Sequence, residues 1–324
     1  MNKVSIVMAT YKPNLEYFKK QLSSLNKQEY SNLELIICDD SADEILFREI
    51  ETIVKANVTA FKVNIVKNKQ NLGSNKTFER LTSLATGEYI AYCDQDDIWE
   101  SYKIKKLVEE LERTHSIVCY SDLAVINEED EVISNSFKKF SKRLNHIHGE
   151  RVYHYFLRRN SITGCTMLVN TEIAKKSIPF PSYDEYVHDH WLALYSSCYG
   201  RVAYVEEPLI KYRIHSNNQI GAKVLFNIDR KHEYLTNKLY VERKKVETLK
   251  RHSLSNENKD IEYGIKCFET FVRERIEFFE DLSFKTLFKF LRHLPFDPIL
   301  ITFEFLVRVL PNFLSHKLIQ KAKS

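Results

Sequence analysis

The chain has 324 residues, of which 44% are hydrophobic and 28% are charged, a globular composition with enough apolar mass for one large or two modest domains. The net charge of +4 is too small to indicate a nucleic-acid partner. The charges are unevenly distributed, since residues 222–324 carry 20 basic and 14 acidic side chains and supply the whole basic excess.

The six cysteines are scattered and form no C-x-x-C pair, so we expect reduced thiols, as in a cytosolic protein. The N-terminus enters a strand-like run directly, without the charged and apolar regions of a signal peptide. No apolar stretch reaches the roughly 18–20 residues that a membrane span needs. We therefore expect a cytoplasmic protein.

In the first 121 residues, short apolar runs rich in β-branched residues alternate with segments of helical period, which is typical of stacked βαβ units. The expected strands, taken as parallel, are residues 4–8, 33–38, 62–66, 88–93 and 116–120. The expected helices include residues 15–25, 78–84 and 104–111. Ligands bind beyond the carboxyl ends of the strands in such sheets, so the chemistry is expected there.

Beyond residue 121 the pattern is less regular. Residues 122–160 are polar and mixed, 161–170 are strand-like, 191–198 are helical, and 201–212 predict a strand and a turn. After Gly221 a long helical periodicity with dense charges continues to the end of the sequence.

Three carboxylates, Asp94, Asp96 and Asp97, follow the expected strand 88–93 within four residues. Their repulsion is offset if a hard divalent cation, Mg²⁺ or Mn²⁺, lies among them. The alternative is a solvated turn in which an Asp caps the next helix. Neither G-x-G-x-x-G nor G-x-x-x-x-G-K-[ST] occurs, which argues against a dinucleotide-binding Rossmann domain and a P-loop NTPase.

The order of several motifs resembles the family-2 glycosyltransferases, which have the nucleotide-sugar-binding GT-A fold. The matching runs are Val4 to Tyr11, Ile36 to Ser41, Asn71 to Gly73, Gly87 to Ile90 and Asp94 to Trp99. The runs Asp94 to Trp99, His188 to Trp191 and Tyr212 to Asn218 further resemble the subgroup assigned as rhamnosyltransferases of bacterial polysaccharide synthesis. The resemblance covers residues 3–221.

The resemblance implies an α/β fold with a mostly parallel sheet and a C-terminal helical region. It implies a GT-A catalytic domain over residues 1–221, with a nucleotide-binding half at 1–121 and an acceptor half at 122–221. The nucleotide site is expected to include Thr10, Tyr11, Asp39, Asn71 and Asp94. A carboxylate at Asp39 would accept the imide N–H that uracil and thymine share, and so would not distinguish UDP from dTDP.

By the same resemblance, Asp96 would ligate Mg²⁺ or Mn²⁺ and His215 would be a further ligand or a diphosphate contact. Asp189 is the expected base that takes the acceptor hydroxyl proton in an inverting transfer; the alternative for it is capping of the helix ahead of Trp191. Weaker candidates for contact with the diphosphate or the acceptor are Arg213, Gly164, His188, His190 and Trp191, with at most one of the two histidines helping to orient the acceptor.

Residues 222–324 match nothing that the resemblance covers. Phe284, Leu287, Phe288 and Leu291 recur at helical spacing with basic residues on other faces, and from Leu282 onward seven basic residues accompany two acidic ones. Such a helix can lie on an anionic membrane surface; the alternative is a helical pair docked on the catalytic domain or in a homodimer interface.

The sequence therefore predicts an inverting, metal-dependent glycosyltransferase that moves L-rhamnose from dTDP-L-rhamnose to a hydroxyl of a lipid-linked glycan, peripheral on the inner face of the cell membrane. A UDP-hexose or UDP-N-acetylhexosamine donor is the first alternative. A non-catalytic nucleotide-binding scaffold is the second, and retention of Asp189 disfavours it because a binding module has no use for a base.

Overall fold

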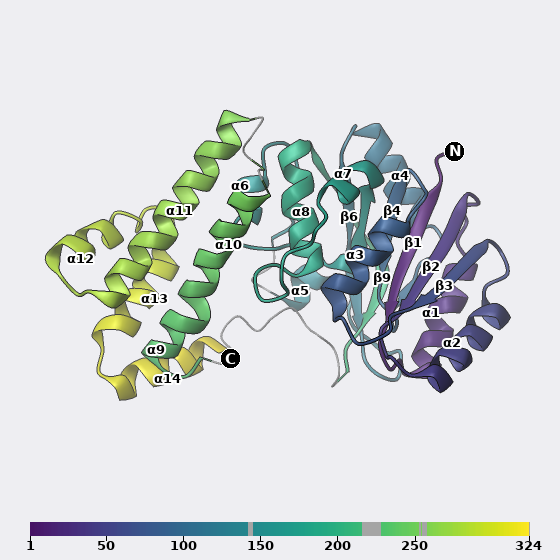
Figure 1. Ribbon diagram of the computed structural model, residues 1–324, viewed down its shortest axis with the longest axis horizontal. Helices are drawn as coiled ribbons and strands as arrows, with labels where there is room; N and C mark the ends of the chain where they lie inside the picture. Colours follow the sequence, from purple (N-terminus) through teal and green to yellow (C-terminus); the bar gives the residue numbers. More distant parts are fainter. Residues whose placement is uncertain (142–144, 216–227, 253, 255–257, 324) are drawn as a thin grey trace. The chain divides into compact units, whose positions relative to one another are not determined.

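The computed structural model describes residues 1–141, 145–215, 228–252, 254 and 258–323 (Figure 1). The chain divides into two compact units, residues 1–216 and 217–324. The expected boundary after residue 221 and the Ser216 to Asn218 part of the last motif lie outside the described residues.

The N-terminal unit is built on one mixed sheet with the strand order β3-β2-β1-β4-β8-β6-β9-β5, and β7 pairs with β6. The strands are β1 (Val4–Thr10), β2 (Leu33–Asp39), β3 (Lys62–Lys67), β4 (Tyr89–Cys93), β5 (Ile98–Trp99), β6 (Val118–Ile126), β7 (Val132–Ser134), β8 (Met167–Asn170) and β9 (Val202–Arg213). Strands β3, β2, β1 and β4 are parallel, as expected; β1, β2 and β4 are buried, whereas β3 at the end of the sheet is partly exposed.

The second part of the sheet differs from the expectation in three respects. Only Met167–Asn170 of the strand-like run 161–170 forms a strand, and this strand lies antiparallel between β4 and β6. Strand β6 continues to Ile126, so the region after residue 121 is not irregular throughout. Strand β9 runs through residues 202–213 without a turn, and its pairing with β6 shifts register near Pro208.

Helices cover both faces of this sheet (Figure 1). One face packs against α1 (Leu15–Asn26), α2 (Glu44–Asn57) and α4 (Lys103–Arg113), whose apolar side chains join the largest core cluster. The other face carries α3 (Ser74–Leu84), α7 (Thr171–Lys176) and α8 (His188–Tyr199), which contact one another and the central strands. The short helices α5 (Phe137–Phe140) and α6 (Tyr153–Phe156) and a 3₁₀ turn (Gly164–Thr166) complete the unit. Full burial of each large apolar side chain in these layers contributes about 1.5–3 kcal/mol.

The C-terminal unit is helical in its described part, as the periodicity predicts. It contains α9 (Lys231–Tyr234), a π-helical turn (Leu235–Leu239), α10 (Tyr240–Arg251), α11 (Lys259–Glu280), α12 (Phe284–Leu291), α13 (Pro298–Val309) and α14 (Asn312–Lys323). Glu304, which interrupts the apolar run of α13, is fully buried and pairs with the guanidinium of Arg275 on α11, while the hydroxyl of Tyr234 donates to it at 2.7 Å. An internal partner thus explains a charge in an otherwise apolar segment. None of the helices in the described residues combines the length and the apolar character needed to span a membrane.

Candidate active site

The polar residues that follow β1, β2 and β4 lie together at one edge of the sheet. Thr10 and Asp39 are direct partners in the register of β1 and β2, and Met8 pairs with Cys93 at the end of β4. Because the three strands are parallel, Asp94 leaves the sheet at the same edge. The structure therefore brings together the residues that the strand order predicted to converge.

Asp39 is fully buried and only half of its carboxylate is satisfied by the protein. Its Oδ1 accepts hydrogen bonds from the hydroxyls of Thr10 at 3.0 Å and Ser41 at 2.8 Å. Its Oδ2 is buried and has no hydrogen-bond partner among the described residues. Burial raises the pKa of this carboxyl group. A buried acceptor without a donor is costly, so the geometry favours a ligand that donates one hydrogen bond here.

Two neighbouring segments border this acceptor. Tyr11 is about half exposed, and its backbone N–H donates to Oε1 of Gln95 at 2.9 Å, which ties the end of β1 to the acidic turn. The carboxylate of Asp40 accepts the backbone N–H groups of Leu72 and Gly73, both at 2.8 Å. The amide of Asn71 lies 3.4 Å from the carbonyl oxygen of Asp40 and its side chain is exposed, so it lies on the rim beside Asp39.

The acidic turn after β4 contains carboxyl groups in two different environments. Asp97 is fully buried, and burial together with the charges of Asp96 and Asp94 raises its pKa well above the ordinary value. It accepts the backbone N–H of Arg213 at 3.1 Å. It does not cap α4, because Tyr102 occupies the cap position of that helix. Asp94 lies at the edge, where burial and the charges of Asp96 and Asp189 raise its pKa to about 7.

Asp96 and His215 are in direct contact. The Nε2 atom of His215 lies 2.8 Å from Oδ2 of Asp96, and both side chains remain slightly exposed. The two residues come from the ends of β4 and β9, which are 119 positions apart in sequence. A carboxylate and an imidazole that converge at a partly open rim can share a divalent cation.

A second set of potential ligand atoms suits such a cation less well. Asp94, Asp97 and Cys165 offer atoms within 4.8 Å of one another. However, burial and the nearby carboxylates raise the pKa of the Cys165 thiol well above its usual value, so it stays protonated. Mg²⁺ and Mn²⁺ prefer oxygen ligands to sulfur. The residues that fit are therefore Asp96 and His215, with Asp94 beside them.

Arg213 is fully buried behind the acidic turn. Its Nε donates to the backbone carbonyl of Asp96 at 2.9 Å, its Nη1 donates to the carbonyl of Asn127 at 3.1 Å, and the guanidinium lies 4.3 Å from the ring centroid of Tyr17. In this position the residue holds the acidic turn in place. Its expected contact with a diphosphate is not visible in this arrangement, because protein groups surround the side chain.

Asp189 lies in the first turn of α8 and points toward the turn that precedes β8. Its Oδ2 accepts the backbone N–H of Gly164 at 3.2 Å and its Oδ1 accepts the side-chain amide of Asn160 at 3.1 Å. Burial raises the pKa of this carboxyl group to about 6. The residue at the helix cap is Val187, and Asp189 lies two positions further on, where its Oδ1 also accepts the backbone N–H of His190 at the start of α8. A carboxylate with this pKa is ionised at neutral pH and can accept a proton.

Asp94 and Asp189 lie close enough to interact, since the charge of Asp189 contributes to the raised pKa of Asp94. Gly164 lies against the first turn of α8. A Cβ atom at Gly164 would lie 2.8 Å from Nε2 of His188 and 3.5 Å from Cβ of Asp189. Glycine is therefore required for the close approach of this turn to α8.

The histidines beside Asp189 are held by the protein. His188 stacks on Phe78, with ring centroids 4.1 Å apart, and burial lowers its pKa to about 3, so the ring is neutral. Nε2 of His190 lies 2.6 Å from the carbonyl oxygen of Phe156. Trp191 is fully buried and its Nε1 donates to the carbonyl of Ser177 at 2.9 Å. His190 and Trp191 thus stabilise the N-terminal turn of α8, and both side chains are buried.

Three polar residues, of which Asn75 and Lys103 are buried, support the site although their sequence context does not single them out. Asn75 on α3 receives the backbone N–H of His188 at 2.9 Å and so fixes the start of α8. Asn160 orients the carboxylate of Asp189. Lys103 on α4 is fully buried beneath the acidic turn, where burial lowers its pKa to about 7 and its Nζ donates to the carbonyl of Cys165.

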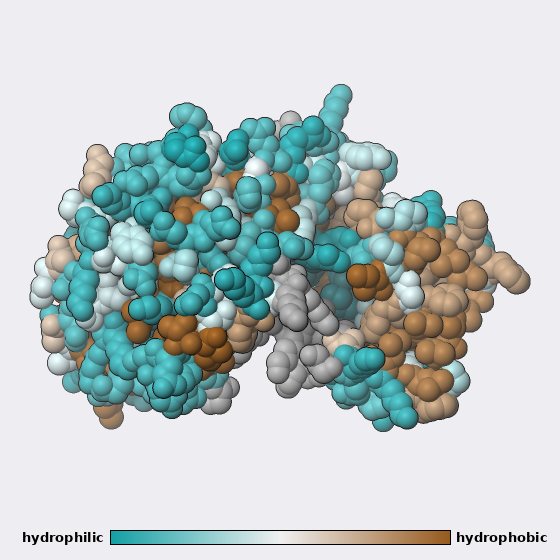
Figure 2. All heavy atoms as spheres, turned by 180° about the vertical axis from the view of Figure 1, so that it is seen from behind, coloured by the Kyte–Doolittle hydropathy of each residue, from teal (hydrophilic) through white to brown (hydrophobic). Residues whose placement is uncertain are grey.

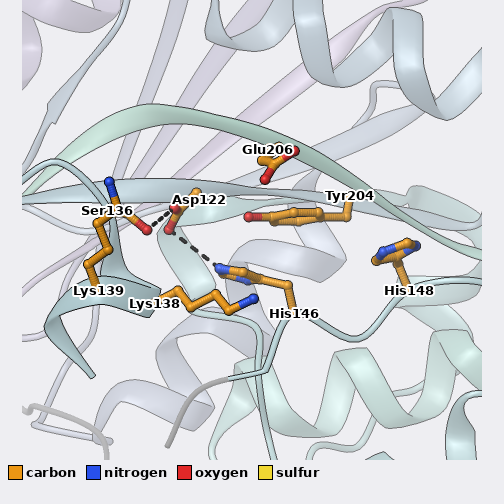
Figure 3. Close-up of a pocket in the computed structure, with 8 residues that line it drawn as sticks. All are labelled: Asp122, Ser136, Lys138, Lys139, His146, His148, Tyr204 and Glu206. Atoms are coloured by element: carbon orange, nitrogen blue, oxygen red, sulfur yellow. Dashed lines mark hydrogen bonds and ion pairs between the residues drawn. The ribbon is translucent and has the colours of Figure 1, made fainter. Parts of the chain in front are cut away.

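Residues between Asp122 and Glu206 also line a cavity of about 340 Å³ that the sequence did not indicate (Figure 3). The ring of Tyr204 lies between the imidazoles of His146 and His148, with centroid distances of 4.3 and 5.8 Å. Asp122 accepts the hydroxyl of Ser136 at the other end of the cavity. Aromatic rings beside hydroxyl and carboxylate groups are suited to a polar ring-shaped ligand.

Comparison with known proteins finds similarity to glycosyltransferases. The family model described as "Glycosyl transferase family 2" matches residues 5–175. An uncharacterized glycosyltransferase of Haemophilus influenzae is 26% identical over 217 residues, which are 66% of this chain and 66% of that protein. The dTDP-rhamnosyl transferase RfbG of Shigella flexneri is 27% identical over 229 residues, 68% of this chain and 75% of RfbG.

Two further matches extend the comparison. The Escherichia coli protein named UDP-Glc:alpha-D-GlcNAc-diphosphoundecaprenol beta-1,3-glucosyltransferase WfaP is 29% identical over 196 residues, 60% of this chain and 71% of WfaP. The crystal structure of residues 1–349 of S. aureus TarS in complex with UDP-GlcNAc superimposes with a TM-score of 0.60 at 14% identity, covering 99% of this chain and 90% of that chain. The shared architecture is the GT-A fold that the sequence predicted.

Proposed function

The chain belongs to glycosyl transferase family 2, and from this premise we propose that it is an inverting, metal-dependent glycosyltransferase that moves L-rhamnose from dTDP-L-rhamnose to a lipid-linked glycan of a bacterial cell-surface polysaccharide. The observation that carries the reaction class is the presence of two buried carboxylates with different surroundings, Asp39 with one oxygen lacking a partner among the described residues and Asp189 with both oxygens hydrogen-bonded. Asp39 presents a buried acceptor atom, and Asp189 presents a base with a pKa of about 6.

In this proposal Asp39 binds the nucleobase. Its Oδ2 accepts the imide N–H of thymine or uracil, and the half-exposed ring of Tyr11 is available to cover the base. Adenine has no ring N–H to donate to this acceptor, so the site favours uracil and thymine over adenine. Asn71 and Thr10 complete the expected nucleotide contacts.

The transfer is a single displacement at the C1 atom of the sugar. Asp189 accepts the proton of the acceptor hydroxyl as its oxygen forms a bond to C1, and the bond between C1 and the diphosphate oxygen breaks, with the electron pair leaving on the diphosphate. Asn160 and the Gly164 N–H hold the carboxylate in position, while the neutral His188 ring packs behind it. Asp96 and His215 would hold Mg²⁺ or Mn²⁺, which supplies positive charge to the leaving diphosphate when bound.

The donor and the acceptor are inferred from the names of similar proteins. The name of RfbG supports dTDP-rhamnose, whereas the name of WfaP supports UDP-glucose, and Asp39 accepts either base. The name of WfaP also supports an acceptor linked to a polyprenol diphosphate, which would place the enzyme at a membrane surface. We assign the Tyr204 cavity to the acceptor side as a subsite for a sugar ring.

The experiment that tests the proposal measures sugar transfer and nucleotide binding on the same variant. Asp189→Asn keeps the shape of the side chain but cannot accept the proton, so transfer should fall by about 10²–10⁴-fold while dTDP binding stays unchanged. Unchanged transfer would remove Asp189 from the mechanism. If no pyrimidine diphosphate bound to the wild type, the chain would instead be a scaffold of a glycan-synthesis complex.

A further inference from the structure

The C-terminal unit has an exposed apolar surface that is unusual for a water-facing helix pair. Six large side chains of α12, the following turn and the start of α13 form it, which we call the α12 face; they are Phe284 (93% exposed), Phe288 (80%), Leu291 (39%), Leu294 (40%), Phe296 (67%) and Ile299 (84%). In Figure 2 hydrophobic residues cover a broad part of this unit, at the right of the view. Contiguous exposed apolar patches mark interaction sites.

The sequence of α12 creates this face because it is apolar on two opposite sides. Phe290 is fully buried and stacks on Phe278 of α11 with ring centroids 4.2 Å apart, so one side anchors the helix to its unit. Phe284, Phe288 and Leu291 follow the spacing i, i+4, i+7 and therefore lie on one other side, directed to solvent. The anchoring does not need these three side chains.

The charged residues of the range 282–323 are mostly basic. Residues 282–323 contain two acidic side chains, and both are buried, since Asp297 caps α13 and Glu304 pairs with Arg275. The seven basic residues of the same range are all at least partly exposed; they are Lys285, Lys289, Arg292, Arg308, Lys317, Lys321 and Lys323.

Acidic groups of α11 pair with two of the three basic residues of α12 and its C-terminal end. Lys289 and Arg292 are paired with Glu277 and Glu274 of α11, whereas Lys285 is exposed on α12 itself. Asp281, at the end of α11, is the exposed carboxyl group next to this range in sequence.

We propose that the α12 face is a docking surface for an anionic lipid bilayer. Phenylalanine and isoleucine side chains would enter the boundary between headgroups and acyl chains, while the exposed Lys285, which lies about a quarter-turn round the helix from the apolar stripe, would contact lipid phosphates. A second copy of this chain fits less well, because an interface of two identical faces would bring two basic rims together.

This inference deepens the proposed function, because a lipid-linked acceptor would lie in the same bilayer. It does not depend on that function, since lipid binding can be measured without donor or acceptor. Failure of vesicle binding would leave the transferase proposal intact, and failure of transfer would leave the docking surface intact.

The test is co-sedimentation of the full chain with vesicles of phosphatidylcholine alone and of phosphatidylcholine mixed with phosphatidylglycerol. The wild type should bind the mixed vesicles and remain in solution with phosphatidylcholine alone. The double variant Phe284→Ser, Phe288→Ser should lose more than about tenfold in partition to the mixed vesicles, because two exposed aromatic side chains no longer enter the bilayer. The matched control is Ile45→Ser on α2, a side chain that is 82% exposed in the other unit, which should bind as the wild type does.

Two charge-reversal variants test the electrostatic contribution to vesicle binding. Lys285→Glu should weaken partition to the mixed vesicles at least about fivefold, whereas Lys105→Glu on α4 should leave it unchanged. Circular dichroism and thermal unfolding of each variant show whether its helices are folded. Equal vesicle binding by the double variant and the wild type would overturn the proposal. A lipid-free wild-type dimer that the double variant converts to a monomer would also overturn it, since the occupant of the face would then be a second copy.

Discussion

The backbone N–H of Gly164 donates to the carboxylate of Asp189 at 3.2 Å, across 25 positions of sequence. This bond joins the turn before β8 to the first turn of α8, and it exists because residue 164 has no side chain. The position of the proposed base is therefore set by a backbone contact that a single methyl group would disturb.

Gly164→Ala should impair catalysis more than stability. The added Cβ would lie 2.8 Å from Nε2 of His188, so the turn or the helix must shift by several tenths of an ångström. Small displacements of a catalytic group reduce turnover by about 100-fold, whereas overpacking costs about 1–3 kcal/mol of stability. Steady-state kinetics and thermal unfolding measure the two effects.

The control for this variant is Gly200→Ala, which creates a clash of similar closeness against Ile117, at 2.6 Å, outside the proposed site. It should lose a similar amount of stability and keep its turnover number. Equal loss of turnover in both variants would show that the effect of Gly164→Ala is a general consequence of destabilisation.

The pH dependence of transfer should report the ionisation of Asp189. Burial raises the pKa of this carboxyl group to about 6, and only its ionised form can accept a proton. At saturating metal, kcat/KM should be constant above this pH and fall tenfold for each pH unit below it. The residual activity of Asp189→Asn should show no such fall, and a wild-type profile that is flat down to pH 4 would contradict the role of Asp189.

The same substitution should stabilise the protein at high pH. A carboxyl group whose pKa rises from 3.8 in the unfolded chain to about 6 in the fold destabilises the folded state once it ionises. The penalty is absent below about pH 4 and complete above about pH 6. Asp189→Asn should therefore gain about 1–3 kcal/mol at pH 8 and nothing at pH 4, as measured by chemical denaturation. If Asp189→Asn instead lost stability at pH 8, the hydrogen bonds to the ionised carboxylate would outweigh the cost of burying it.

Asp39→Asn should weaken pyrimidine nucleotides selectively. The substitution removes the charged acceptor at the buried Oδ2 position, and a hydrogen bond to a charged group contributes about 1.5–3 kcal/mol, so dTDP and UDP should bind about 10- to 100-fold more weakly. ADP serves as the internal control, because adenine has no ring N–H for Oδ2 to accept, so its weak binding should not change. Equal loss for all three nucleotides would indicate a structural effect in place of base recognition.

Chelation of divalent cations should abolish transfer. A variant of His215 should show whether the cation binds beside Asp96. His215→Ala removes the imidazole that lies 2.8 Å from Asp96, so the Mn²⁺ concentration for half-maximal activity should rise about 10- to 100-fold. His232→Ala, an exposed histidine of the C-terminal unit, is the matched control and should leave the metal requirement unchanged. An unchanged requirement in His215→Ala would move the metal site to other residues.

Much of the N-terminal sheet could be predicted from sequence because its strands are buried on both faces. β1, β2 and β4 are continuous apolar runs, and parallel strands must end at one edge, so the convergence of Thr10, Asp39 and Asp94 followed from the pattern. Helix α2 was not identified, because only Ile50 and Val54 of its 14 residues are fully buried and its apolar stripe is narrow.

Other features depend on contacts between distant segments and had no local signal. The direction of β8 is set by its place between β4 and β6, and a four-residue run does not encode that. The position of Arg213 at the end of a strand suggested contact with a phosphate. In the fold its guanidinium donates to the backbone carbonyls of Asp96 and Asn127. Asn160 and Asn75 orient the base only because α8 packs against both of their segments.

The most direct test of the central claim is nucleoside diphosphate release from dTDP-L-rhamnose and from UDP-glucose, measured with Mn²⁺ on the wild type and on Asp189→Asn, alongside calorimetric binding of dTDP and UDP to both. The account predicts metal-dependent release by the wild type, faster with dTDP-L-rhamnose, and a variant that binds the nucleotide with unchanged affinity but releases it at least about 100-fold more slowly. Faster release from UDP-glucose would keep the reaction and change the donor. Absence of pyrimidine diphosphate binding, or equal release by the variant, would contradict the account.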